Sequence, residues 1–156
     1  MIEETLRTEF EALKNDFEII RQQIESDVVR TELYKGEFYE LTPYSYQRNG
    51  FRTRKTCKAS WYNKKHQKSL YLRINNQNQI VEVKVGCSIE DQFYHTFLYY
   101  TDNLVKSILY DNGKHLMNVC HYFFEDGSWN GHSYVVSMVA VKKIISIKKM
   151  LWHILK

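Results

Sequence analysis

The sequence predicts an α+β domain in which one long N-terminal helix packs on a mainly antiparallel sheet. Two observations carry this prediction. Apolar residues recur at helical spacing through the first 28 positions, and beyond Gly36 short runs of alternating apolar and polar residues are separated by Asn-Gly and similar turn residues. With 156 residues, 44% of them apolar and 26% charged, the chain fits one globular domain over residues 1–156. The expected element order is α-β-β-β-β-α-β-β-α.

A long helix is expected over residues 1–35. Eight apolar residues step by three or four positions and therefore share one helix face. They are Ile2, Leu6, Phe10, Leu13, Phe17, Ile20, Ile24 and Val28. No proline or glycine precedes Gly36, which stands where a helix C-cap glycine belongs. The same stripe also fits a coiled-coil seam, so a homodimer through this helix is a second prediction.

A sheet is expected over residues 36–141. Asn49-Gly50 separates the runs 38–48 and 51–62, and this dipeptide between two such runs predicts a hairpin. Pro43 places the first of these strands at a sheet edge. A further hairpin joins residues 69–74 to 80–85 across four amide residues. In it Leu70, Leu72, Ile74, Val81, Val83 and Val85 are expected to point one way, and Tyr71, Arg73, Glu82 and Lys84 the other.

One helix is expected to interrupt the sheet. Its apolar residues recur at helical steps and are Ile89, Phe93, Phe97, Tyr100, Leu104 and Ile108. Ser88 resembles an N-cap, and Asn112-Gly113 resembles a helix stop. Strands over 116–124 and 134–141 follow. The basic tail over 142–156 predicts a short amphipathic C-terminal helix, which either docks on the domain or lies on an anionic membrane.

The distribution of charge is more informative than its net value of +4. Residues 1–40 carry −6, residues 41–81 carry +9 with no acid, residues 82–126 carry −4, and residues 127–156 carry +5. Strand alternation places a set of basic and tyrosine residues on one sheet face. They are Arg52, Arg54, Lys58, Tyr62, Tyr71, Arg73 and Lys84. We expect this face to bind a partner, unless the acidic N-terminal helix covers it or it is simply solvated.

Two classes of partner fit this face. Arginine and tyrosine dominate protein-binding hot spots, so the leading prediction is a small non-enzymatic module that blocks a protein partner with an acidic surface. Compact α+β chains of this size often serve as immunity proteins, inhibitors or chaperones, and the element order resembles that of secretion chaperones, whose usual acidity this basic chain lacks. The alternative is RNA or single-stranded nucleic acid, bound through the basic 48–73 face by phosphate contacts and base stacking.

Enzyme chemistry is weakly supported by the spacing of residues. Glu82-Val83-Lys84, on a strand before the expected helix, is similar to the core of PD-(D/E)xK nucleases. That resemblance implies a metal-dependent nuclease in which Glu82 would help to hold Mg²⁺. No Asp or Glu lies between Glu40 and Glu82, so the second carboxylate of that site is missing. His115, Cys120, His121 and His132 lack the paired spacing of zinc ligands, and we expect no catalytic residue, metal or cofactor.

Cysteine usage and hydropathy predict a cytoplasmic protein. Cys57, Cys87 and Cys120 are odd in number and widely spaced, which is typical of free thiols in a reducing compartment. The longest apolar runs, around 93–100 and 134–141, are too short to be transmembrane segments. The acidic start of the chain is unlike a secretory signal.

Overall fold

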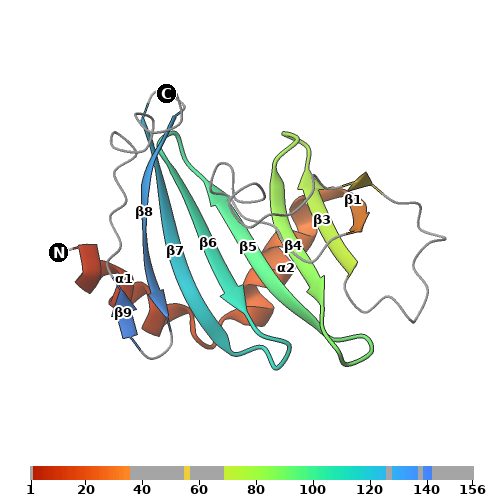
Figure 1. Ribbon diagram of the computed structural model, residues 1–156, viewed down its shortest axis with the longest axis horizontal. Coiled ribbons are helices and arrows are strands. Elements are labelled where there is room, and N and C mark those ends of the chain that lie inside the picture. The colour runs from red at the N-terminus through yellow and green to blue at the C-terminus, as the bar shows by residue number, and fades with distance from the viewer. Residues whose placement is uncertain (1, 36–54, 57–68, 126–127, 137–138, 142–156) are drawn as a thin grey trace, which may run out of the picture.

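Two short helices cross one face of a single antiparallel sheet (Figure 1). The computed structural model describes residues 2–35, 55–56, 69–125, 128–136 and 139–141. Helix α1 spans Ile2–Leu13 and helix α2 spans Phe17–Asp27. The strands are β1 (Val28–Lys35), β2 (Lys55–Thr56), β3 (Ser69–Asn75), β4 (Ile80–Gly86), β5 (Phe93–Tyr100), β6 (Leu104–Tyr110), β7 (Leu116–Glu125), β8 (Ser128–Val136) and β9 (Val139–Val141). The predicted α+β class with an antiparallel sheet is confirmed.

The described strands form one sheet in the order β2-β1-β3-β4-β5-β6-β7-β8-β9. From β3 onward each strand pairs with the next strand in sequence, which makes a simple meander. Helix α2 lies across the middle of this meander, over β3 to β6, and α1 lies against its far end at β7 and β8 (Figure 1). The helices therefore cover one sheet face, and residues of β3, β4 and β5 that point to this face lie beside α2.

The helices bury their apolar stripe against this face. The ring of Phe17 is central to the contact, with its centroid 5.1 Å from that of His95, 5.2 Å from Tyr110 and 5.8 Å from Phe97. The same cluster contains Leu6, Phe10, Ile20, Ile24, Val81, Ile108, Leu116 and Val119. A second buried cluster consists of Leu70, Leu72, Val83 and Leu98. It lies on the opposite face of the sheet, so the central strands are buried on both sides.

The predicted hairpin of residues 69–74 and 80–85 is confirmed as β3 and β4. Its turn is closed by Asn75, whose Oδ1 accepts hydrogen bonds from the backbone N–H groups of Gln77 at 3.1 Å and Gln79 at 2.9 Å. One apolar residue departs from the predicted alternation. A register shift beside Ile74 turns Val81 to the helix side, where it joins the cluster around Phe17.

The prediction of one helix over residues 1–35 is wrong in two respects. The helix breaks after Leu13, whose carbonyl oxygen accepts a hydrogen bond from the N–H of Asp16 at 3.1 Å, and α2 begins at Phe17. The second helix then ends at Asp27, and Val28 starts a strand, because β-branched residues of β1 suit an extended backbone better than a helix. From Leu6 to Ile24, the apolar stripe continues across the break and packs on the chain's own sheet rather than lying exposed as a seam for a homodimer.

The predicted helix over 89–108 is also wrong, because these residues form β5 and β6. A step of four residues keeps side chains on one face of a helix and equally on one face of a strand, whose period is two. Phe97 and Leu98 point to opposite faces yet are both buried, so strand alternation is hidden in the sequence. Asn112-Gly113, the expected helix stop, lies in the β6–β7 turn, where Oδ1 of Asp111 accepts the Gly113 N–H at 2.8 Å.

The element order predicted from the sequence is therefore incorrect after the first helix. The strands expected over 38–48 and 51–62 fall outside the described residues except at 55–56, where β2 pairs with β1. The C-terminal helix expected over 142–156 falls outside them entirely.

Candidate functional site

A strip of charged and aromatic side chains lies on the helix side of β3, β4 and β5. The cross-strand register creates it, because Arg73 pairs with Glu82, Tyr71 pairs with Lys84, and Lys84 pairs in turn with His95. Residues directly opposite one another in antiparallel strands point to the same face. This arrangement brings together three of the residues that the sequence predicts for partner binding, namely Tyr71, Arg73 and Lys84.

Glu82 is the buried centre of this strip. Its side chain is only 1% exposed, and each of its two oxygens has its own partner. Oε2 accepts a hydrogen bond from Arg73 Nη1 at 2.9 Å, and Oε1 lies 2.7 Å from His95 Nδ1. A buried carboxylate is tolerated only when its charge is paired and its oxygens are hydrogen-bonded. The predicted strand alternation places Glu82 and Arg73 on the same face, as the structure does, and the structure adds that Glu82 is buried there.

This geometry leaves Glu82 unsuited to a metal ion. Both of its oxygens already contact nitrogen atoms, and a strand follows β4 where the nuclease resemblance implies a helix. Within the part of the chain that the structure describes, no three His, Cys, Asp or Glu side chains are grouped so that they could hold a metal.

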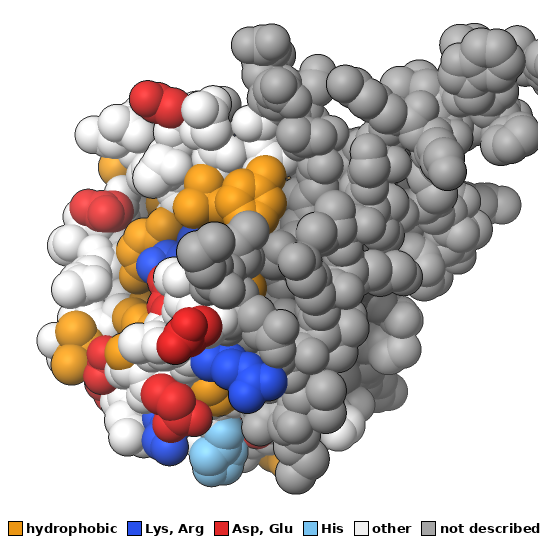
Figure 2. All heavy atoms as spheres, turned by 90° about the vertical axis from the view of Figure 1, so that its left-hand side faces the viewer, with side chains coloured by type: hydrophobic (Ala, Val, Ile, Leu, Met, Phe, Trp, Pro, Cys, Tyr) orange, Lys and Arg blue, Asp and Glu red, His pale blue; other side chains and the backbone are white. Residues whose placement is uncertain are grey.

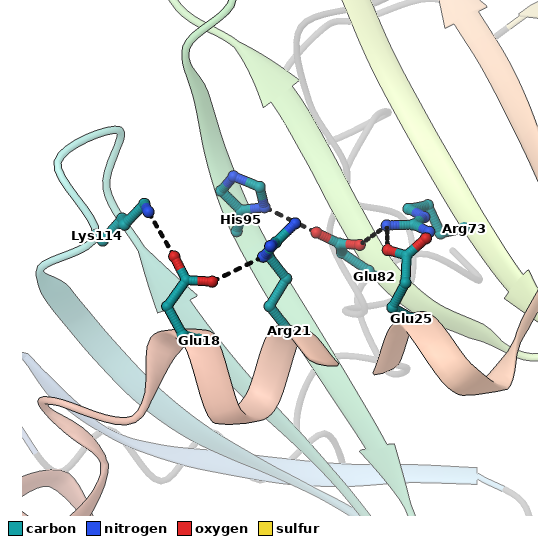
Figure 3. A network of polar contacts seen from close by, with 7 residues as sticks. All are labelled: Glu18, Arg21, Glu25, Arg73, Glu82, His95 and Lys114. Atoms are coloured by element: carbon teal, nitrogen blue, oxygen red, sulfur yellow. Dashed lines mark hydrogen bonds and ion pairs between the residues drawn. The ribbon is translucent and has the colours of Figure 1, made fainter. Parts of the chain in front are cut away.

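Helix α2 contributes a second carboxylate to the same arginine. Glu25 Oε2 lies 2.7 Å from Arg73 Nη1 (Figure 3). The two carboxylates differ greatly in environment, because the Glu25 side chain is 57% exposed and that of Glu82 is 1% exposed. The hydrogen bond from Arg73 lowers the pKa of Glu25, and the same contact raises the pKa of Arg73. Arg73 is therefore held in its charged form between a buried and an exposed carboxylate.

Further ion pairs continue along α2 toward the β6–β7 turn. Glu18 contacts Lys114 of that turn, and Arg21 Nε donates to Glu18 at 3.0 Å (Figure 3). These side chains alternate in sign from the turn to β3. On the face of the molecule seen in Figure 2, carboxylates, cations and a histidine likewise lie side by side rather than in separate patches of one sign. The acidic helices thus neutralise much of the charge of the sheet that they cover.

Lys84 is the exception to this neutralisation. Its Nζ lies 4.5 Å from the ring centroid of Phe93 and 6.0 Å from that of Tyr71, which are cation–π distances. Among the described residues, no carboxylate reaches ion-pair distance of this nitrogen. Partial burial is the main cause of a lowered Lys84 pKa, opposed by the nearby charge of Glu82. Lys84, Tyr71 and Phe93 are called the Lys84 cluster below.

A separate polar contact holds α1 to the far end of the sheet. Glu9 accepts a hydrogen bond from Lys106 Nζ at 2.8 Å, and its other oxygen lies 2.8 Å from His121 Nε2. The histidine is the main cause of a Glu9 pKa lowered to about 2. Cys120, next to His121 in β7, points to the opposite face and is buried, and burial raises the pKa of its thiol to about 12. The contact of Glu9 with Lys106 and His121 is structural in character, because it joins α1 to the strands beneath it.

The structure describes only some of the predicted site residues. Tyr71, Arg73 and Lys84 share one face, as expected. Arg52, Arg54, Lys58 and Tyr62 lie outside the described residues. Sequence reasoning missed Glu25, Phe93 and His95 as members of the same strip. Phe93 and His95 were assigned to a helix, and only a correct strand register would have brought them opposite Lys84 and its neighbours.

Comparisons with known proteins add no relationship: no protein-family model, no curated protein and no solved structure matches the chain. Neither described helix has the length and apolar character that crossing a membrane requires.

Proposed function

We propose that this chain is a non-enzymatic protein-binding module that docks an acidic surface of its partner on the Lys84 cluster. The supporting observation is a partly buried lysine that lies against two aromatic rings and has no carboxylate partner among the described residues. Charged groups elsewhere on this strip are paired within the chain. Among the described cations of this strip, Lys84 is therefore the one that gains most from an incoming acid.

Physical chemistry favours an acidic group as the ligand of this lysine. Lys84 has already lost part of its hydration, so a carboxylate that approaches it meets a smaller desolvation cost than it would at a fully exposed lysine. The attraction between the charges is also stronger where water is partly excluded. Tyr71 and Phe93 supply rigid apolar surface beside the charge, and this combination is typical of binding hot spots.

The binding mode that follows is steric and electrostatic blocking, as immunity proteins, inhibitors and chaperones employ it. In this proposal Arg52, Arg54, Lys58 and Tyr62 extend the contact beyond the Lys84 cluster and steer the acidic partner toward it. Arg73 contributes less free charge than the sequence suggests, because Glu25 and Glu82 already contact it.

Copurification from native host cells tests this proposal. We would compare the tagged wild-type chain with Lys84→Glu and with the matched control Lys14→Glu. The Lys14 side chain lies in the turn after α1, is 51% exposed and, among the described residues, forms an ion pair with Glu11 alone. Each sample is treated with nuclease and washed at two salt concentrations. We expect one protein to copurify stoichiometrically, to resist nuclease, and to be lost with Lys84→Glu but retained with Lys14→Glu.

Two outcomes would contradict the proposal. Equal retention by both lysine variants would place the partner on another surface. Release by nuclease, together with a steep loss at high salt, would instead support the nucleic-acid alternative, in which the rings of Tyr71 and Phe93 stack on bases and Lys84 contacts a phosphate.

A further inference from the structure

Arg73 and Lys84 are diagonal neighbours on adjacent strands of the helix-side face. Lys84 pairs with Tyr71, and Arg73 stands two residues further along β3. Diagonal neighbours of this kind lie about 7–8 Å apart, which long side chains such as these readily bridge. The charges of Arg73 and Glu25 both act on the pKa of Lys84, so the three groups are electrostatically coupled.

The contacts of Arg73 use only part of its guanidinium group. Glu25 and Glu82 both meet the same nitrogen, Nη1. Among the described residues, neither Nε nor Nη2 of Arg73 forms an ion pair. Arginine offers five N–H donors in a planar fork that matches the two oxygens of a carboxylate. Once Glu25 has moved away, an incoming carboxylate therefore meets several donors of Arg73 and, beside them, the ammonium group of Lys84, which no described carboxylate pairs.

We propose that Arg73 and Lys84 together bind one carboxylate of an acidic partner segment, and that Glu25 occupies the Arg73 half of this site when the partner is absent. The inference rests on the proposed function and specifies its ligand chemistry and its regulation. Glu25 acts as an internal competitor, because it is an acidic side chain of the same chain placed where the partner's carboxylate binds.

Burial explains why Glu25 rather than Glu82 is the replaceable carboxylate. Glu82 is enclosed, and its departure would leave Arg73 without its buried counter-charge and His95 Nδ1 without its hydrogen-bond partner. Glu25 is more than half exposed and can exchange Arg73 for water at little cost, since exposed ion pairs are weak. Arg73 stays paired with Glu82 throughout, so the exchange at Nη1 never creates an isolated buried charge.

The test measures binding of a fluorescein-labelled hexaglutamate peptide by fluorescence anisotropy. The variants are Glu25→Gln, its control Glu18→Gln, Lys84→Met and the double variant of Glu25→Gln with Lys84→Met. Glu18 is a suitable control because it lies on the same helix and its side chain is 48% exposed. Its replacement by glutamine changes the net charge by the same amount as Glu25→Gln. Circular dichroism establishes that each variant is folded.

We expect Glu25→Gln to lower the peptide Kd by about two- to five-fold, the range expected for the loss of one competing exposed ion pair. Glu18→Gln should leave the Kd within a factor of 1.5, on the order of the weakest exposed pairs. Lys84→Met should weaken binding in the wild-type chain and should also abolish the gain from Glu25→Gln.

The failures of the two proposals are distinguishable. If Glu25→Gln and Glu18→Gln change the Kd equally, the competitor role of Glu25 is overturned, whereas peptide binding that depends on Lys84 would still support the proposed function. If the peptide binds with no dependence on Lys84, the carboxylate site is overturned. The copurification experiment described above, in which capture of a protein partner depends on Lys84, then tests the proposed function independently of the peptide.

Discussion

Two carboxylates that contact one nitrogen of Arg73 should differ several-fold in their contribution to stability. Glu82→Gln removes the charge from a side chain that is 1% exposed and holds both Arg73 and His95. Removing one member of a buried ion pair costs about 3–5 kcal/mol, because the remaining charge is left without its partner in a low-dielectric site. Glu25→Gln removes an exposed contact to the same arginine and should cost at most about 1 kcal/mol.

Urea denaturation followed by circular dichroism measures this difference. Urea m-values of about 2 kcal/mol/M are usual for small proteins, so Glu82→Gln should lower the denaturation midpoint by about 1.5–2.5 M. Glu25→Gln should lower it by no more than about 0.5 M. Equal shifts for the two variants, or a smaller shift for Glu82→Gln, would show that burial does not control the strength of these contacts.

Three further predictions concern other described groups. The folded-state pKa of Glu9 is lowered to about 2, so its ionised form stabilises the fold fully above about pH 4.5, and this contribution should be lost as the pH falls toward 2. Glu9→Gln should therefore lower the free energy of unfolding at pH 7 by about 1–2 kcal/mol, a value discounted for solvent screening. At pH 2 the same substitution should not lower it. With Cys57 replaced by serine, Cys87 should react with a thiol reagent in the native protein. Cys120 is buried and its thiol pKa is raised to about 12, so it should react only on unfolding. Comparable reaction rates for Cys87 and Cys120 would contradict the burial of Cys120. Tyr110→Phe removes the 2.6 Å hydrogen bond from the Tyr110 hydroxyl to the carbonyl oxygen of Leu13, the last residue of α1, and should destabilise the fold by about 1–2 kcal/mol in thermal or urea unfolding. The control Tyr94→Phe, at a partly exposed ring, should change stability by less than about 0.5 kcal/mol.

The class of fold could be predicted from the sequence, but the identity of several elements could not. From Leu6 to Ile24, the apolar stripe correctly indicates a helical face that packs on a sheet. It cannot reveal the break after Leu13, because the step of four to Phe17 keeps both residues on that face. The aromatic residues and Thr96 within 93–100 favour a strand, yet burial on both sides removes the alternation by which a strand is usually recognised.

The candidate site was predictable only where local pairing defines it. The turn at 75–78 fixes the register of β3 and β4, and that register alone brings Tyr71, Arg73 and Lys84 onto one face. Glu25 is 48 residues from Arg73 in the sequence, and no local pattern relates them. The alternation of acidic and basic blocks does hint at contacts between them, and the Glu25–Arg73 pair is one such contact.

In the proposed function the Lys84 cluster touches a protein partner, and site-specific crosslinking would detect that contact. A photoreactive benzoylphenylalanine is placed at Phe93, within the cluster, or at Ile19, whose side chain is 57% exposed on the outer face of α2. After irradiation of native host cells, we predict a protein crosslink from position 93 that is absent from position 19 and is lost when Lys84→Glu is added. A crosslink from position 19 alone, or one from position 93 that survives Lys84→Glu, would show that the partner does not bind at the Lys84 cluster.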